Sequence, residues 1–148
     1  MHATLLLLHS VVRYFVLIFL IVIIVRSFMN WQKKSAFTST DDKMSLWLLI
    51  LTHMQALVGF TLYFFTSSAV VFSSDTMKDK TARYWTVEHI TMMLIAVVLI
   101  TVARSTSKKL PEPAAKHRRL FVLNVIALLI ILAAIATSGR GFFNIAGY

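Results

Sequence analysis

The sequence of 148 residues has no cysteine, only two prolines and only six acidic residues. The absence of cysteine excludes disulfides, thiolate metal sites, iron–sulfur clusters and covalently attached c-type haem. Charged residues make up 14% of the chain against 58% hydrophobic ones, which excludes an ordinary soluble domain. The sequence also has no phosphate loop, nucleophile elbow, GxGxxG motif or internal repeat.

Most of the chain consists of four apolar runs, each close to the roughly 20 residues that a helix needs to cross a bilayer. They cover residues 5–28, 44–65, 84–103 and 120–136. We therefore predict an all-α fold in which residues 1–148 form one transmembrane domain, an up-down-up-down four-helix bundle. The first run is longer than the apolar core of a signal peptide and follows no basic segment, so we expect it to be kept as the first helix.

A few polar residues give local expectations. Asp41 or Asp42 is the expected N-cap of the second helix, because a side-chain oxygen there can accept a backbone N–H. Within that helix, His53 is predicted to share a stripe with Ala56, Phe60 and Tyr63.

The formal net charge of +9 comes from basic residues in short segments beside the apolar runs. Nucleic acid would require a solvated basic face, so we expect no nucleic acid partner. By the positive-inside rule, residues 26–43 and 104–119 are cytoplasmic, and both termini lie outside, in the periplasm of a bacterial inner membrane. The lipid bilayer is then the first partner, and the sequence leaves a homo-oligomer open.

Three histidines fall inside the predicted helices: His9 on the first, His53 on the second and His89 on the third. The first and third helices lie diagonally in such a bundle, and His9 and His89 both lie about 6 to 8 Å below the outer surface. His53 lies on the order of 10 Å deeper. Two imidazoles at one depth can ligate a haem iron from both faces, so His9 and His89 are the predicted axial ligands of a non-covalent haem b, with His53 as an alternative ligand.

Two charged residues within the apolar runs need partners, because an ionisable group in hydrocarbon costs roughly 2.5 to 3.5 kcal/mol on insertion scales. Arg13 shares a helix face with His9 and is a candidate partner for a haem propionate. Glu88 could instead pair with Arg13, or accept a hydrogen bond from the non-ligating nitrogen of His9. The sequence leaves these alternatives open. His2 and His117, near the membrane edges, are expected to be solvated.

Three segments, HSVVRYFVL at 9–17, THMQALVGFTLYF at 52–64 and EHITMMLIAVVLIT at 88–101, resemble a group of small four-helix bacterial membrane proteins. These proteins are found largely in Bacteroidetes and are labelled cytochrome b. The likeness covers most of the chain, including the basic KHRR before the fourth run. The resemblance implies a non-covalent haem b in an inner-membrane bundle, with candidate ligands His9, His53 and His89 and pocket residues Arg13, Gln55 and Glu88.

The leading hypothesis is a cytochrome that carries single electrons near the outer face, to or from a quinone or a larger respiratory complex. A second is an enzyme that oxidises protoporphyrinogen, like other small four-helix haem proteins, although their local motifs are not matched here. A third is a non-catalytic accessory subunit whose histidines only form hydrogen bonds between helices. A three-histidine copper or zinc site is the fourth, and the different depth of His53 argues against it.

Overall fold

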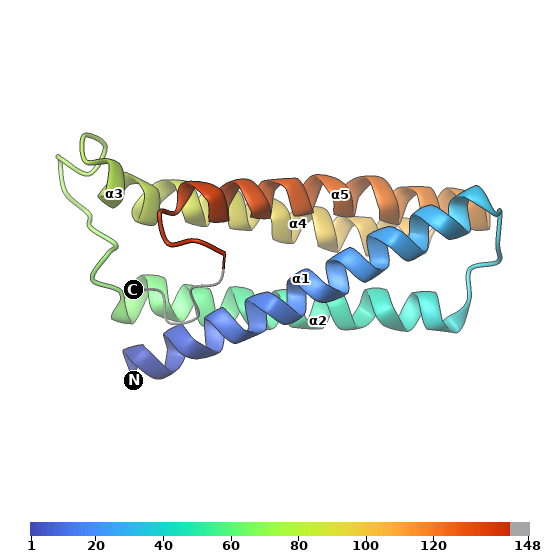
Figure 1. The fold of residues 1–148 in the computed structure, drawn as a ribbon, viewed down its shortest axis with the longest axis horizontal. Helices are drawn as coiled ribbons and strands as arrows, with labels where there is room; N and C mark the ends of the chain where they lie inside the picture. The colour runs from blue at the N-terminus through green and yellow to red at the C-terminus, as the bar shows by residue number, and fades with distance from the viewer. Residues whose placement is uncertain (143–148) are drawn as a thin grey trace.

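The computed structural model describes residues 1–142, which are helical apart from their connections. Four long helices lie side by side (Figure 1): α1 (His2–Gln32), α2 (Ser39–Thr61), α4 (His89–Ser107) and α5 (Pro113–Thr137). Shorter segments extend two of them. The π-helix η1 (Leu62–Thr66) continues α2, whereas α3 (Lys80–Arg83) and the π-helix η2 (Tyr84–Glu88) lead into α4. The described residues contain no strand, and the prediction of an all-α fold with four long helices is confirmed.

Each helix extends beyond its apolar run, and at α2 polar flanking residues supply the cap. α2 begins at Ser39, since Thr38 and Asp41 form a capping box. In this box the backbone N–H of Asp41 donates to Thr38 Oγ1 at 3.3 Å, and that of Thr38 donates to Asp41 Oδ2 at 2.9 Å. The expected N-cap at Asp41 or Asp42 is therefore wrong, and Thr38 is the cap. α5 begins with Pro113, whose missing N–H is not needed in the first turn.

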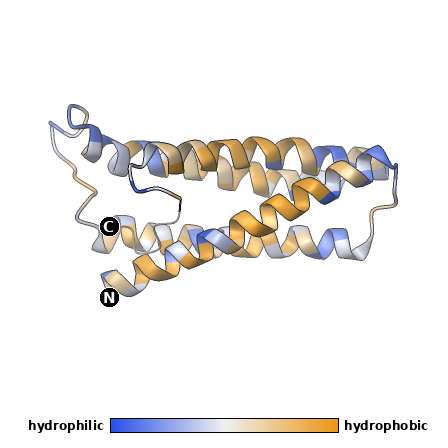
Figure 2. Ribbon diagram, viewed as in Figure 1, coloured by the Kyte–Doolittle hydropathy of each residue, from blue (hydrophilic) through white to orange (hydrophobic). Residues whose placement is uncertain are grey.

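All four long helices, with their extensions, are long and apolar enough to cross a membrane. Large apolar side chains on their outward faces, such as Phe15, Ile18 and Leu129, are more than half exposed. Figure 2 shows the apolar residues along the length of the helices and the polar residues gathered mainly toward their ends. The chain therefore has the composition and the exposed surface of a multi-pass membrane protein.

The four long helices form a ring of neighbours. α1 packs against α2 and α5, and α4 packs against the same two helices, so α1 and α4 occupy opposite corners of the bundle. A core of small and branched apolar residues joins them, including Leu20, Leu48, Ile100 and Ala127. α1 crosses the others at an angle, so that its first turns lie away from α4 and α5 (Figure 1). The helices are consequently less closely packed at the end where the chain begins.

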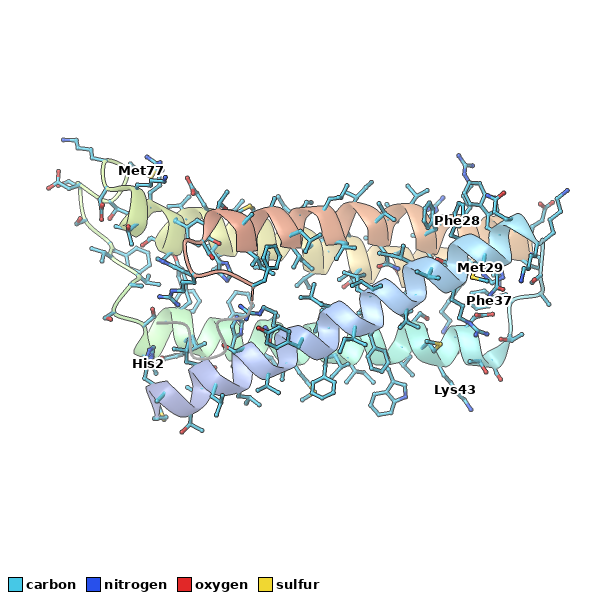
Figure 3. All side chains as sticks on the ribbon, in the orientation of Figure 1. His2, Phe28, Met29, Phe37, Lys43 and Met77 are labelled. Atoms are coloured by element: carbon cyan, nitrogen blue, oxygen red, sulfur yellow. The ribbon has the colours of Figure 1, made fainter. Side chains whose placement is uncertain are left out.

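The end of the bundle opposite the N-terminus holds two ion pairs. Arg26 Nε lies 2.6 Å from Asp41 Oδ1, and Arg104 Nη1 lies 3.1 Å from Asp42 Oδ1. Figure 3 places Lys43 at this end, and His2 and Met77 at the other. Two of the basic residues that the sequence suggests as membrane-orientation signals therefore also join helices to one another.

His117 belongs to this end as well. The expectation that it is solvated is wrong, because its side chain is only 1% exposed. The segment after α1 covers it: His117 Nε2 lies 3.4 Å from the carbonyl oxygen of Ala36, and the ring of Phe37 packs beside the imidazole. The histidine thus has a structural role in seating the connection between α1 and α2.

Candidate functional site

A cavity of about 480 Å³ lies between the four long helices, toward the end where the chain begins. Its volume falls within the roughly 300 to 1,000 Å³ that is typical of cofactor and small-molecule pockets. The walls are mainly apolar side chains from all four long helices, and the segments 67–70 and 138–140 also contribute. Among its polar lining residues are His2, His9, Ser10, Arg13, Thr52, Gln55, Ser67, His89 and Arg140.

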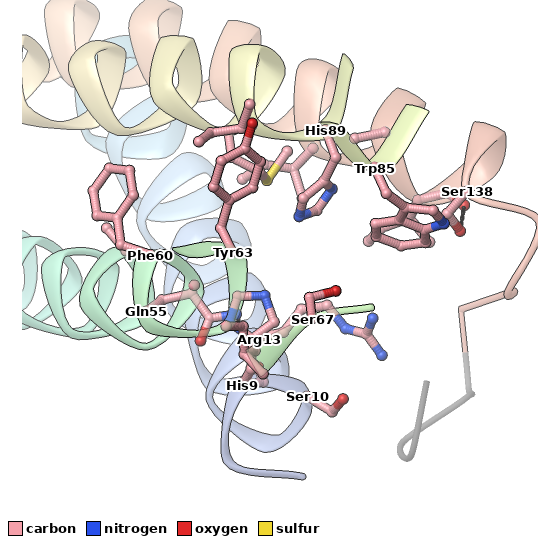
Figure 4. A pocket seen from close by; sticks show the side chains of 18 of the residues that line it. His9, Ser10, Arg13, Gln55, Phe60, Tyr63, Ser67, Trp85, His89 and Ser138 are labelled. Carbon is pink, nitrogen blue, oxygen red and sulfur yellow. Dashed lines mark hydrogen bonds between the residues drawn. The ribbon is translucent and has the colours of Figure 1, made fainter. Parts of the chain in front are cut away.

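His9 and His89 lie on opposite sides of this cavity. His9 comes from α1 and His89 from the first residue of α4, and these helices occupy opposite corners of the bundle. Figure 4 shows the two imidazoles projecting from these helices into the space between them. The structure therefore brings together the two histidines that the sequence suggests as a pair.

The surroundings of His9 hold its backbone but give its ring nitrogen Nδ1 no hydrogen bond among the described residues. Gln55 Nε2 donates a hydrogen bond of 2.8 Å to the carbonyl oxygen of His9. The ring packs against Gly59, where an added Cβ would lie 3.2 Å from His9 Cε1. His9 Nδ1 is buried and has no hydrogen-bond partner in the described part of the chain. An unsatisfied buried polar atom costs about 1 to 3 kcal/mol, so hydrogen bonds of this ring nitrogen within the described residues do not explain the position of the imidazole.

His89 is held by residues of the π-helix η2. Tyr84 Oη donates a hydrogen bond of 2.5 Å to the carbonyl oxygen of Ala134 and lies 3.4 Å from His89 Nδ1. Since the one phenolic proton goes to Ala134, Tyr84 can only accept from His89, and this favours the tautomer with the proton on Nδ1. Nε2 then keeps its lone pair. The ring of Trp85 packs beside the imidazole, with 5.2 Å between the ring centroids.

Glu88 does not take part in the cavity. Its carboxylate pairs with Arg83, with 3.0 Å between Oε1 and Nε, and the residue does not line the space. Neither of the expected interactions, with Arg13 or with the ring of His9, is formed. The reason is local: η2 is wound as a π-helix, in which residues five apart share a face, so Glu88 lies beside Arg83.

His53 is also outside the cavity. The side chain is exposed, and its Nε2 lies 3.2 Å from Thr101 Oγ1 on α4. Ala56, Phe60 and Tyr63 do line the cavity, so the predicted stripe is right for these three and stops short of His53. The cavity face of α2 is centred on Thr52, Ala56 and Gly59, and the next residue after Thr52 is turned about 100° away from it. Residues 1–142 contain no group of three ligating side chains placed to hold a metal ion, so no three-histidine site forms there.

Sequence reasoning missed Arg140, which lines the cavity from the segment after α5. Its guanidinium carbon lies 4.1 Å from the centroid of the Trp85 ring, and its backbone N–H donates to Ser138 Oγ at 3.1 Å. Burial lowers the pKa of the Arg140 guanidinium, and the nearby Tyr84 phenol raises it. The signal in the sequence was a lone arginine following the last apolar run, at the same end of the predicted bundle as His9.

Comparisons of the chain with protein-family models, curated proteins and solved structures give no match. The site itself, two imidazoles facing each other across a mainly apolar cavity, is therefore the basis on which a function can be assigned.

Proposed function

We propose that this chain is a membrane cytochrome that binds one haem b non-covalently and carries single electrons, with His9 and His89 as the axial ligands. The observation that carries the proposal is that these two imidazoles, from helices at opposite corners of the bundle, line one cavity. Haem iron accepts histidine on both faces, and helical bundles commonly build cofactor sites from side chains on facing helices.

The residues around the cavity fit a flat apolar macrocycle. Ala56 and Gly59 carry little or no side chain, which opens the surface of α2 beside His9. His9 Nδ1 has no hydrogen-bond partner among the described residues, so this atom does not join α1 to a neighbouring helix there. Haem, when bound, would supply a one-electron change between ferric and ferrous iron. The chain itself supplies the apolar walls that exclude water and the groups that hold the two imidazoles.

Those holding groups can be named. Gln55 fixes the backbone of α1 at His9, because its side-chain amide donates to the His9 carbonyl oxygen. Tyr84 links η2 to α5 through Ala134 and lies within reach of His89 Nδ1. A ligating histidine is usually oriented by a hydrogen bond from its other ring nitrogen, and Tyr84 is placed to accept that bond.

The proposal includes a placement in the membrane. The bundle is up-down-up-down in a bacterial inner membrane, with residues 33–38 and 108–112 cytoplasmic and both termini periplasmic. Supporting this, the basic residues of 26–43 and 104–119 flank the connections α1–α2 and α4–α5. The cavity then lies toward the periplasmic face, where a quinone or a larger respiratory complex would exchange electrons with it.

A visible spectrum of the purified protein tests the proposal. We expect a Soret band, and an α band after reduction with dithionite. His9→Ala and His89→Ala should each abolish the six-coordinate spectrum, whereas His53→Ala, which removes a histidine outside the cavity, should leave it unchanged. Colourless protein after expression with adequate haem would reject the haem proposal.

The accessory-subunit hypothesis is less well supported by the site. Histidines that only joined helices would have ring partners on neighbouring helices, and His9 Nδ1 has none in the described residues. The protoporphyrinogen-oxidising hypothesis predicts the same absorption bands as a cytochrome. Rescue of a bacterial strain that lacks its own protoporphyrinogen oxidase would favour the enzyme.

A further inference from the structure

The charged side chains that the described residues contribute to the cavity all have one sign. Arg13 comes from α1 and Arg140 from the segment after α5, and three histidines lie in the same lining. Among the described residues, no aspartate or glutamate contributes to it. Glu88, which precedes His89 in the sequence, does not line the cavity and is paired with Arg83. A lining with two guanidinium groups, and with no carboxylate side chain among residues 1–142, is complementary to an anionic ligand.

Arg140 is held close to the histidine pair by an aromatic ring. Its guanidinium lies over Trp85, and the imidazole of His89 also packs against the Trp85 ring. The three groups therefore form a row that leads from the end of α5 to a proposed iron ligand. Arginine stays protonated in proteins, so Arg140 presents a partly desolvated positive charge at the cavity.

We propose that Arg140, together with Arg13, binds the two carboxylates of the porphyrin, so that the cavity selects a porphyrin dicarboxylate over a neutral macrocycle or a neutral quinone. This inference rests on the proposed function, since it concerns the same cavity, and it adds the chemical class that the cavity recognises. A guanidinium can donate two parallel hydrogen bonds to one carboxylate, which a neutral ester or quinone cannot accept with the same strength. The aromatic contact with Trp85 orients the Arg140 guanidinium before the ligand arrives.

The test uses metal-free protoporphyrin IX and its dimethyl ester, which have the same ring and differ in the two carboxylates. The purified full-length protein in detergent is titrated with each, and binding is followed by porphyrin fluorescence. We expect the wild-type protein to bind the free acid about tenfold or more tightly than the ester, because the ester cannot form charge-assisted hydrogen bonds with arginine. Arg140→Gln should reduce this preference by about tenfold.

Arg118→Gln is the matched control, because Arg118 also lies over a tryptophan, with 6.0 Å between its guanidinium carbon and the Trp31 centroid, but does not line the cavity. It should keep the wild-type preference. Comparing preferences between variants removes the difference in detergent partitioning between acid and ester. Equal binding of acid and ester by the wild-type protein, or an unchanged preference in Arg140→Gln, would overturn the inference.

The two proposals fail in different ways. The protein could prefer the free acid through Arg140 and yet show no six-coordinate haem spectrum. That result would reject the electron-carrier proposal and would support the selectivity of the cavity. A six-coordinate spectrum without that preference would remove the selectivity alone. Failure of the protein to bind any porphyrin would remove both.

Discussion

At the scale of single residues, the site depends on how close the backbone of α2 comes to the ring of His9. Gly59 has no side chain. His9 Cε1 can therefore lie at a position where it would be in close contact with the Cβ of any other residue. The glycine is helical with an ordinary φ, so its value here is space rather than conformational freedom. Gly59 thus sets the position of a proposed ligand from the neighbouring helix.

Gly59→Ala should therefore separate stability from cofactor binding. The added methyl group would lie 3.2 Å from His9 Cε1, which is closer than most Cβ contacts, so the imidazole must shift by a few tenths of an ångström. Alanine itself favours the helix over glycine by up to about 1 kcal/mol. We expect an unchanged or slightly raised melting temperature, and a haem affinity several-fold lower.

The measurement is the ratio of Soret to protein absorbance at limiting haem, together with thermal unfolding. Leu57→Ala, on the same helix and 67% exposed, is the control and should leave the haem ratio unchanged. If Gly59→Ala kept the wild-type affinity and band shape, the contact with His9 would be unimportant for binding.

At the scale of elements, the π-helix η2 distinguishes the observed site from the one expected from the sequence. The hydropathy of the runs was enough to predict four long helices. A run of about 20 apolar residues suits a bilayer, and a single segment can pair its backbone groups there only as a helix. It could not predict a turn with five-residue spacing, since the pattern within one turn is too short to show a change of period. The placement of Glu88 beside Arg83, rather than near Arg13, follows from that turn.

The same limit explains why the sequence suggested His53 as a site residue and did not suggest Arg140. Hydropathy gives no sharp edge to the cavity face of α2, so His53 could be placed on the stripe of Ala56 although it is exposed beside Thr101. Arg140 lies after the last apolar run, and its place depends on how the chain turns back toward Trp85, which is a tertiary contact. By contrast, His9 and His89 were found because each lies a fixed number of residues inside a long helix, and helical rise converts that number to depth.

Tyr84→Phe tests the role of η2 in orienting His89. The variant loses the hydrogen bond to Ala134 and the group that accepts from His89 Nδ1. We expect a loss of about 1 to 2 kcal/mol in stability. We also expect a higher haem midpoint potential, because a less basic imidazole stabilises ferric iron less well.

Tyr63→Phe is the matched control for this experiment. Tyr63 also lines the cavity, and its Oη donates to a backbone carbonyl across elements, that of Thr86, at 2.6 Å. The control should lose similar stability and keep the wild-type potential, as measured by a spectroscopic redox titration. Equal potentials in the two variants would show that Tyr84 acts only in packing.

At the scale of the whole molecule, charge is distributed unevenly between the two ends of the bundle. The connections α1–α2 and α4–α5 are flanked by lysine and arginine, whereas the connection 67–79 contains Asp75 and Asp79 beside Lys78. Short basic segments resist translocation, so this asymmetry favours one orientation in the membrane. The orientation decides which side of the membrane the cavity faces, and hence which partners could exchange electrons with the proposed haem.

The absence of native cysteine allows this orientation to be measured directly. Met77→Cys places a thiol in the connection before α3, at a position that is 59% exposed, and Lys109→Cys places one between α4 and α5. In intact cells, a membrane-impermeant maleimide should label Met77→Cys and leave Lys109→Cys unlabelled until the membrane is disrupted. Labelling in the opposite order would place the cavity toward the cytoplasm. That result would contradict electron exchange with a periplasmic partner. Haem spectra of both variants, unchanged from the wild type, would show that the bundle is intact during labelling.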